Sequence, residues 1–132
     1  MEIPVELAQI IINETADEQV VVLRELVGVH RTFPIVIGMA EICAIDRRVK
    51  GIELPRPLTH DLLVNTIEQM GGRIQKVVIC DLREHTFFAT IHVLRNGEVL
   101  KIDSRPSDAL AMSAGLDIPL FVEECVFEKM QL

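Results

Sequence analysis

The chain has very few aromatic side chains. Its 132 residues include five phenylalanines and neither tyrosine nor tryptophan. Proteins that bind single-stranded nucleic acid without sequence preference stack successive bases on aromatic rings. The composition therefore excludes a base-stacking platform as the means by which this protein would contact nucleic acid.

Cysteine is also scarce, and the three cysteines are scattered. They stand at positions 43, 80 and 125, and no two of them form a C-x-x-C pair. An odd, dispersed set of cysteines is typical of reduced thiols, so we expect a cytoplasmic protein without structural disulfides. The same spacing excludes a zinc knuckle made from these cysteines alone.

Long apolar runs and an excess of positive charge are both missing. No apolar stretch reaches the roughly 20 residues of a membrane-spanning helix, and the N-terminal MEIPVEL lacks the positive charge of a secretory signal. We therefore expect no membrane association. The formal net charge of −7 argues against a protein that coats nucleic acid through many phosphate contacts, although a local basic strip is compatible with it.

Hydrophobic residues make up 49% of the chain, enough for a folded core. The length fits one domain over residues 1–132. Alternating and helical apolar patterns, together with adjacent hairpins, predict an α+β fold with a mixed, largely antiparallel sheet and about three short helices. The expected strands cover residues 1–12, 19–27, 33–37, 73–82, 87–94, 99–103 and 119–124, and the expected helices cover residues 38–50, 59–70 and 109–114.

The dipeptide Asn96-Gly97 is the strongest hairpin signal in the chain. If these two residues form the loop, Arg95 faces Glu98 and the register of both strands follows. Alternation then assigns to the core face Ile91, Val93, Leu100 and Ile102. It assigns to the opposite, polar face Thr90, His92, Lys101 and Asp103. We expect His92 to be exposed on that polar face.

The stretch KIDSRPSDAL, residues 101–110, concentrates polar side chains at a strand-to-helix turn. These side chains surround Pro106 and belong to Asp103, Ser104, Arg105, Ser107 and Asp108. Groups of this kind at such a turn can hold an anion, a metal ion or a proton. In the structural alternative Arg105 is the N-cap residue and Asp108 caps free backbone N–H groups, which is worth about 1 kcal/mol. That alternative leaves Asp103 and Arg105 unexplained.

A second stretch, PRPLTHD at residues 55–61, repeats this arrangement before another helix. Arg56-Pro57 precedes Asp61, just as Arg105-Pro106 precedes Asp108, and Thr59 is the expected N-cap. The expected helix at 38–50 ends in a basic turn that contains Arg47, Arg48 and Lys50. These cations either complement the helix C-terminus or form a phosphate-binding patch together with Arg56.

Five blocks of the sequence, in this order, resemble the bifunctional nuclease domain family, which occurs in bacteria and in plant proteins. They are FPIVIG followed by Glu41, RPLTHDLL, TFFATI, IDSRPSDALAM and IPLFVEECV. The resemblance covers most of the chain. It implies nuclease activity on both RNA and DNA, so nucleic acid is the expected partner.

The motifs that carry this resemblance supply the candidate site residues. They are Arg56, His60 and Asp61 in one motif, and Asp103, Arg105, Ser107 and Asp108 in the other. We expect the two helix starts to face each other across a shallow cleft. Arg56 and Arg105 would hold a phosphate of the substrate, because a guanidinium matches its oxygens bidentately, and Ser107 would bind substrate beside them.

The acidic residues of the two motifs suggest a metal ion. Asp103 and Asp108, with Asp61 as a further candidate, would bind a divalent ion such as Mg²⁺, which prefers carboxylate oxygens. The ion would activate water and stabilise the leaving oxygen. His60 would act as general base or general acid.

Other interpretations remain open from the sequence. In one, Arg56 and Arg105 pair with Asp61 and Asp108 in a network that only pins the two helix starts. The protein is then a non-catalytic binding module for a phosphate-bearing ligand or a protein partner. In another, the protein is an enzyme acting on a small phosphate ester. The mean hydropathy of +0.33 and the need to cover sheet edges favour a homo-oligomer, with a dimer as the default.

Overall fold

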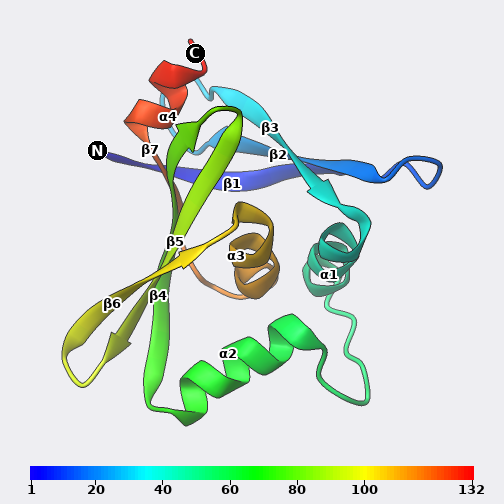
Figure 1. Ribbon diagram of the computed structural model, residues 1–132, viewed down its shortest axis with the longest axis vertical. Helices are drawn as coiled ribbons and strands as arrows, with labels where there is room; N and C mark the ends of the chain where they lie inside the picture. The colour runs from blue at the N-terminus through cyan, green and yellow to red at the C-terminus, as the bar shows by residue number, and fades with distance from the viewer.

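The computed structural model describes all 132 residues as a seven-stranded sheet with four helices (Figure 1). It confirms the predicted α+β fold. The strands are β1 (Glu2–Ile11), β2 (Glu18–Glu25), β3 (Thr32–Gly38), β4 (Gly72–Arg83), β5 (Thr86–Arg95), β6 (Glu98–Ser104) and β7 (Leu120–Glu123). The helices are α1 (Met39–Val49), α2 (Thr59–Gln69), α3 (Pro106–Ser113) and α4 (Glu124–Lys129). None of these helices is long and apolar enough to cross a membrane.

The sheet consists of two antiparallel meanders joined by β7. The strand order is β3-β2-β1-β7-β4-β5-β6, so β6 and β3 are the two edges. β7 pairs antiparallel with β1 and parallel with β4, which makes β4–β7 the one parallel pair. The predicted mixed, largely antiparallel sheet is therefore confirmed.

Helix α3 occupies the centre of the molecule, between the two meanders, and packs against both α1 and α2 (Figure 1). Seven of its eight residues are buried. The small side chains of Ala109 and Ala111, both fully buried, allow neighbouring elements to approach its backbone closely. Pro106 stands at the first turn, where its missing N–H costs no hydrogen bond. The first turn of α3 is therefore held rigidly against the core.

The helix boundaries largely agree with the sequence prediction. α2 begins at Thr59, but its N-cap is Leu58 and not the expected Thr59. α3 begins at Pro106 with Arg105 as its N-cap, as in the structural alternative, and not at Ala109. The short C-terminal α4 was not predicted. It follows β7 without a turn residue, so no glycine or proline marks its start.

The hairpin register around Asn96-Gly97 is confirmed over the whole of β6, from Arg95–Glu98 to Ala89–Ser104. Two burial predictions for these strands are wrong. Leu100 and Ile102 are 41% and 42% exposed, because β6 is an edge strand and nothing covers it. His92 is only 6% exposed, because it stands on an inner strand beside the side chains of Lys76 and Glu2.

Candidate functional site

The carboxylate of Asp108, in the first turn of α3, joins the first turns of all three larger helices. Its Oδ1 lies 3.0 Å from Nε2 of His60, in the first turn of α2. Arg105, the N-cap of α3, donates from Nε to Oδ2 over 2.9 Å and from Nη2 to Oδ1 over 3.2 Å. The same Nη2 reaches Oε1 of Glu41, in the first turn of α1, over 3.0 Å. The starts of the two motif helices therefore meet directly at Asp108, and not across the shallow cleft that the sequence predicted.

These contacts replace the cap predicted for α3. Asp108 makes no hydrogen bond to the free backbone N–H groups of α3, and both of its oxygens bind side chains instead. Burial would raise the pKa of the Asp108 carboxyl, but hydrogen bonds from Arg105 and His60 outweigh it and hold this pKa below its usual range. Asp108 is therefore ionised near neutral pH.

His60 is oriented by this ionised carboxylate. A carboxylate only accepts hydrogen bonds, so Nε2 of His60 carries a proton and donates it to Asp108. The other ring nitrogen, Nδ1, has no partner within the chain. It is also open to solvent, because the only buried side-chain nitrogen or oxygen without a partner is Nε of Arg47. The side chain of His60 as a whole is 14% exposed.

A cleft of about 490 Å³ opens beside Arg105 and Ser107. Ser107 is 7% exposed, and its hydroxyl has no hydrogen-bond partner within the chain, so it is available to a ligand in the cleft. The side chain of Arg105 is 67% exposed, and its Nη1 makes no contact within the chain. His85 and Thr86, from the turn between β4 and β5, line the same cleft.

The cleft carries a small excess of negative charge rather than a positive charge. Asp17 and Glu18, from the start of β2, also line the cleft. Arg105 is the one arginine or lysine there. The cleft therefore offers a binding site for a single phosphate more readily than a basic groove for a long polyanion.

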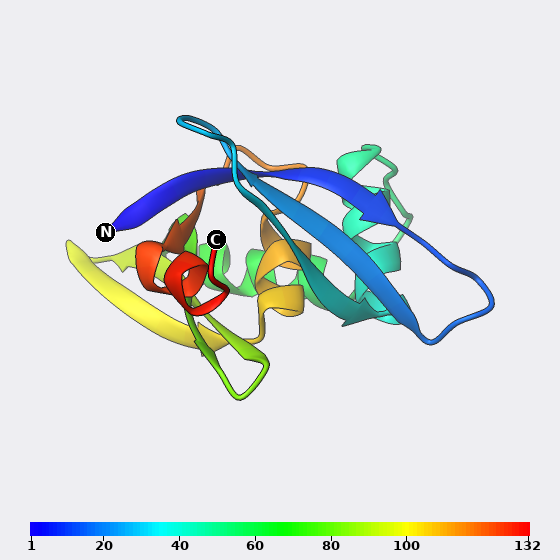
Figure 2. The ribbon, with the colours of Figure 1, turned by 90° about the horizontal axis from the view of Figure 1, so that it is seen from above.

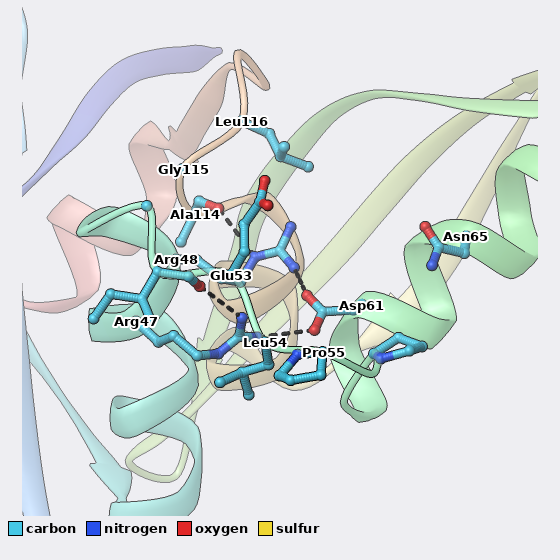
Figure 3. A pocket seen from close by; sticks show the side chains of 13 residues that line it. Arg47, Arg48, Glu53, Leu54, Pro55, Asp61, Asn65, Ala114, Gly115 and Leu116 are labelled. Carbon is cyan, nitrogen blue, oxygen red and sulfur yellow. Dashed lines mark hydrogen bonds and ion pairs between the residues drawn. The ribbon is translucent and has the colours of Figure 1, made fainter.

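Asp61 belongs to a separate network, shown in Figure 3. It accepts a hydrogen bond from Nη2 of Arg47 over 3.0 Å and forms an ion pair with Nη1 of Arg48. Its Oδ2 also accepts from the backbone N–H of Leu58 over 3.0 Å. Burial would raise the pKa of Asp61, but the Leu58 N–H and the two guanidinium groups keep this pKa below its usual range.

Arg48 ties this network to the end of α3. Its side chain is 10% exposed and donates to the carbonyl oxygen of Ala114 over 3.1 Å (Figure 3) and to that of Met112 over 3.0 Å. All three of its donor nitrogens are therefore used within the protein. The alternative in which Arg56 pairs with Asp61 is wrong, because Arg47 and Arg48 bind this carboxylate.

Two of the sequence-predicted site residues lie apart from Asp108. Asp103 is exposed on β6 opposite Thr90, on the sheet face away from Ile91 and Ile102, and it makes no ion pair. Arg56 is exposed on the loop before α2 and has no partner within the chain. The structure thus brings together His60, Arg105 and Asp108, with Ser107 in the adjoining cleft.

This arrangement does not fit the expected two-carboxylate metal site. Asp103 and Asp108 are on different sides of the sheet, and both oxygens of Asp108 are paired with cations. No group of three or more His, Cys, Asp or Glu side chains is placed to hold a metal ion.

The sequence did not predict the partners of three residues in these networks. Glu41 belongs to one of the family blocks, and Arg47 and Arg48 belong to the basic end of the first expected helix. Glu41 and Arg105 are 64 residues apart along the chain. Arg47 and Arg48 are 14 and 13 residues from Asp61. Local sequence patterns carry no signal for such pairs.

Comparison with known proteins agrees with the motifs. An uncharacterized protein of Mycobacterium tuberculosis is 39% identical over 121 residues, which are 92% of this chain and 71% of that protein. Bifunctional nuclease 1 of Oryza sativa subsp. indica is 21% identical over 114 residues, 84% of this chain. The chain spans 34% of that rice protein. The family profile of the bifunctional nuclease domain matches residues 21–132, and the chain belongs to this family.

Proposed function

We propose that this protein is a nuclease that hydrolyses phosphodiester bonds in RNA and DNA. The observation that carries the proposal is the contact of one carboxylate, Asp108, with both His60 and Arg105, of which Arg105 lines the cleft. Membership of the bifunctional nuclease domain family supports a nuclease-related role, and a related rice protein is named a bifunctional nuclease.

Arg105 is the proposed phosphate-binding residue. Its free Nη1 and its exposed position allow it to bind a phosphate oxygen, and the unpartnered hydroxyl of Ser107 lines the same cleft. Arg105 and His60 share Asp108, which links the proposed phosphate-binding residue to the imidazole. Arg56, exposed and unpaired, is a candidate for a neighbouring phosphate of the same strand.

His60 is the proposed general base and general acid. Asp108 fixes its ring and its Nε2 proton, which leaves the lone pair of Nδ1 to accept a proton from water. The water oxygen forms a bond to phosphorus, and the bond from phosphorus to the leaving sugar oxygen breaks. His60 then returns the proton to that oxygen. Water rather than a ribose hydroxyl is the nucleophile, so the same scheme serves RNA and DNA.

A requirement for Mg²⁺ or another divalent ion stays a prediction from the sequence, as does the assignment of Asp103 to the site. The residues around Asp108 do not provide a metal site by themselves. The assay below therefore includes the metal ion as a variable. A cytoplasmic location also stays a prediction.

A specific observation favours the second candidate, a non-catalytic phosphate-binding module. Arg105 is paired with Asp108 and Glu41, and Asp61 is paired with two arginines, as in a purely structural ion-pair network. On this account Arg105 and Ser107 still bind a phosphate-bearing ligand. His60 then has no role in bond cleavage.

The test compares cleavage of single-stranded RNA, double-stranded DNA and a small phosphodiester, bis(p-nitrophenyl) phosphate. Wild type is run beside Arg105→Ala and Arg24→Ala, each with Mg²⁺, with Mn²⁺ and with chelator. Arg24 is a matched control, because it is 47% exposed, is also paired with a carboxylate (that of Glu6), and does not line the cleft. We expect Arg105→Ala to lose at least tenfold in kcat/KM on both polymers, in line with loss of a charge-assisted phosphate contact, and Arg24→Ala to match wild type.

The other possible results of this assay each favour a different function or contradict the proposed site. Cleavage of the small ester alone indicates an enzyme for small phosphate esters. Binding of nucleic acid or phosphate that Arg105→Ala weakens, without cleavage in any condition, indicates the binding module. Equal cleavage by all three proteins contradicts the proposed site.

A further inference from the structure

Strand β6 forms an open edge of the sheet, visible as the yellow strand at the rim of the molecule in Figure 2. β5 is its only neighbour, and the residues from Glu98 to Asp103 are all exposed. Its ladder with β5 runs without a bulge. Leu100 and Ile102 are more than 40% exposed, although they share a face with the buried Ile91 and Val93. A regular, uncovered edge with apolar side chains is a template for another strand.

The other edge of the sheet is protected. β3 contains Pro34, which is exposed and has no N–H group to donate to an added strand. Proline on an edge strand is a common means of preventing edge-to-edge association. β6 contains no proline. The two edges therefore differ in their capacity to accept a further strand.

The turn at Asn96-Gly97 fixes which backbone groups of β6 are free. Both residues have positive φ, 52° and 76°, as in a type I′ turn, in which the closing pair Arg95–Glu98 is hydrogen-bonded. Bonded and non-bonded pairs then alternate along the ladder. The residues of β6 whose N–H and C=O groups point outward, away from β5, are Val99, Lys101 and Asp103.

A second copy of β6 can pair with this edge in few registers. The outward-pointing backbone groups of one copy must hydrogen-bond the outward-pointing groups of the other. These groups belong to every second residue of β6, so the two-fold axis that relates the copies passes through a residue and not between two residues. An axis at Lys101 makes two ammonium groups face each other, and an axis at Asp103 does the same with two carboxylates. An axis at Leu100 sets Lys101 opposite Val99 and Glu98 opposite Ile102.

An axis at Ile102 gives complementary contacts on both faces. The two Ile102 side chains meet on the face that carries the helices. On the other face, Lys101 of each copy lies opposite Asp103 of the other, which forms two pairs of opposite charge. Neither Lys101 nor Asp103 has an ion-pair partner within its own chain. Opposite charges directly across two strands are favourable, and like charges are unfavourable.

We propose that the protein forms a homodimer in which β6 pairs antiparallel with β6 of a second copy, about a two-fold axis at Ile102. The interface is isologous, so each copy contributes the same surface. The seven-stranded sheet continues from one subunit into the other. Asp103 then serves association rather than the Asp108 site, and the proposal does not depend on nuclease activity.

A charge-reversal series tests the interface. The mass in solution is measured by analytical ultracentrifugation at micromolar concentration for wild type, Lys101→Asp, Asp103→Lys and the double variant. We expect a dimer for wild type, at least a tenfold weaker dimer for each single variant, and recovery in the double variant because the two pairs are re-formed with reversed sign. A monomeric wild type, or a double variant no better than the single ones, overturns the proposal.

Disulfide cross-linking tests the register. Ile102→Cys and Leu100→Cys are compared in a Cys43→Ser background, because Cys43 is an exposed free thiol. Facing residues of a non-bonded pair have Cα atoms about 4.5 Å apart, within the range of a disulfide. The two Leu100 positions lie about 14 Å apart in this register, from four residues at about 3.4 Å each.

The proposal expects an oxidised covalent dimer from Ile102→Cys and none from Leu100→Cys. The reverse result overturns the register at Ile102. A dimeric wild type with no cross-link from either variant overturns β6 as the interface. Val36→Lys, a change at a similarly exposed position on the protected edge β3, leaves the dimer intact, whereas Ile102→Lys breaks it.

Discussion

Asp108 and His60 start two different helices, stand 48 residues apart in the sequence, and lie 3.0 Å apart between Oδ1 and Nε2. This contact places an oriented imidazole next to Arg105, which binds the same carboxylate. A histidine held by an aspartate and an arginine with a free donor are the parts that general acid–base cleavage of a phosphodiester uses. The proposed nuclease activity depends on this contact between Asp108 and His60.

Replacement of Asp108 by asparagine should make the free energy of unfolding depend less on pH in the acid range. The pKa of Asp108 is lowered, so the ionised carboxylate stabilises the fold above its unfolded pKa near 3.8, and this contribution is lost as pH falls through the lower folded pKa. We expect Asp108→Asn to unfold about 1–2 kcal/mol more easily at pH 6, and this gap to narrow below pH 4. Urea unfolding at several pH values measures it. A gap that stays constant down to pH 2 contradicts the contact.

His92 should give the protein a second, milder pH dependence. Burial, and next the charge of Lys76, lower the pKa of His92 below its usual 6.5. The unfolded chain therefore binds more protons, and the free energy of unfolding decreases as pH falls below 6.5 until the folded pKa is reached. His92→Gln should flatten the curve of unfolding free energy between pH 7 and pH 5. An unchanged slope in His92→Gln means that another group is responsible.

Gly115 and Gly51 make a matched pair for backbone strain. Both have positive φ, 73° and 69°, but a Cβ at Gly115 would lie against the carbonyl oxygen of Arg48, whereas nothing is near Gly51. We expect Gly51→Ala to cost about 1 kcal/mol and Gly115→Ala about 2–3 kcal/mol or more. Thermal unfolding of the two variants checks the difference. Equal losses contradict the close approach of α1 to the segment after α3.

Asp61 should matter for stability through Arg47 and Arg48. Its side chain is 21% exposed, and without its charge two mostly buried guanidinium groups lose their counter-ion. We expect Asp61→Asn to lower the free energy of unfolding by about 2–3 kcal/mol. Asp46→Asn is the control, because Asp46 pairs only with the exposed Lys50 and should cost less than about 0.5 kcal/mol. Similar losses for both variants contradict a structural role for the Asp61 network.

The sequence predicted the elements whose determinants are local. Asn96-Gly97 set the register of β5 and β6, because a two-residue turn with positive φ fixes the pairing of every residue that follows. Pro106 marked the start of α3. The meeting of the two motif helices was also expected, from the repeated Arg-Pro and acidic pattern and from the family resemblance.

Features that depend on distant segments were not predicted. Alternation assigns Leu100 and Ile102 to a face, but their exposure depends on whether any element covers that face at the edge of the sheet. The structural alternative paired Asp61 with the nearby Arg56, yet Arg47 and Arg48 at the end of α1 bind it instead. The predicted register already assigns Asp103 to the sheet face opposite Ile102. The prediction of a metal site shared by Asp103 and Asp108 is not compatible with that register.

The measurement that tests the central claim most directly is the cleavage rate of His60→Gln against wild type. His30→Gln is prepared in parallel as a matched histidine change, because His30 lies in the turn before β3 and contacts only the Glu25 carbonyl oxygen. If His60 is the general base and acid, His60→Gln loses about 10²–10⁴-fold in kcat on RNA and on DNA, which is the typical contribution of such a residue. His30→Gln keeps the wild-type rate. Equal cleavage by folded His60→Gln and wild type would contradict the role of His60 and, with it, the proposed site.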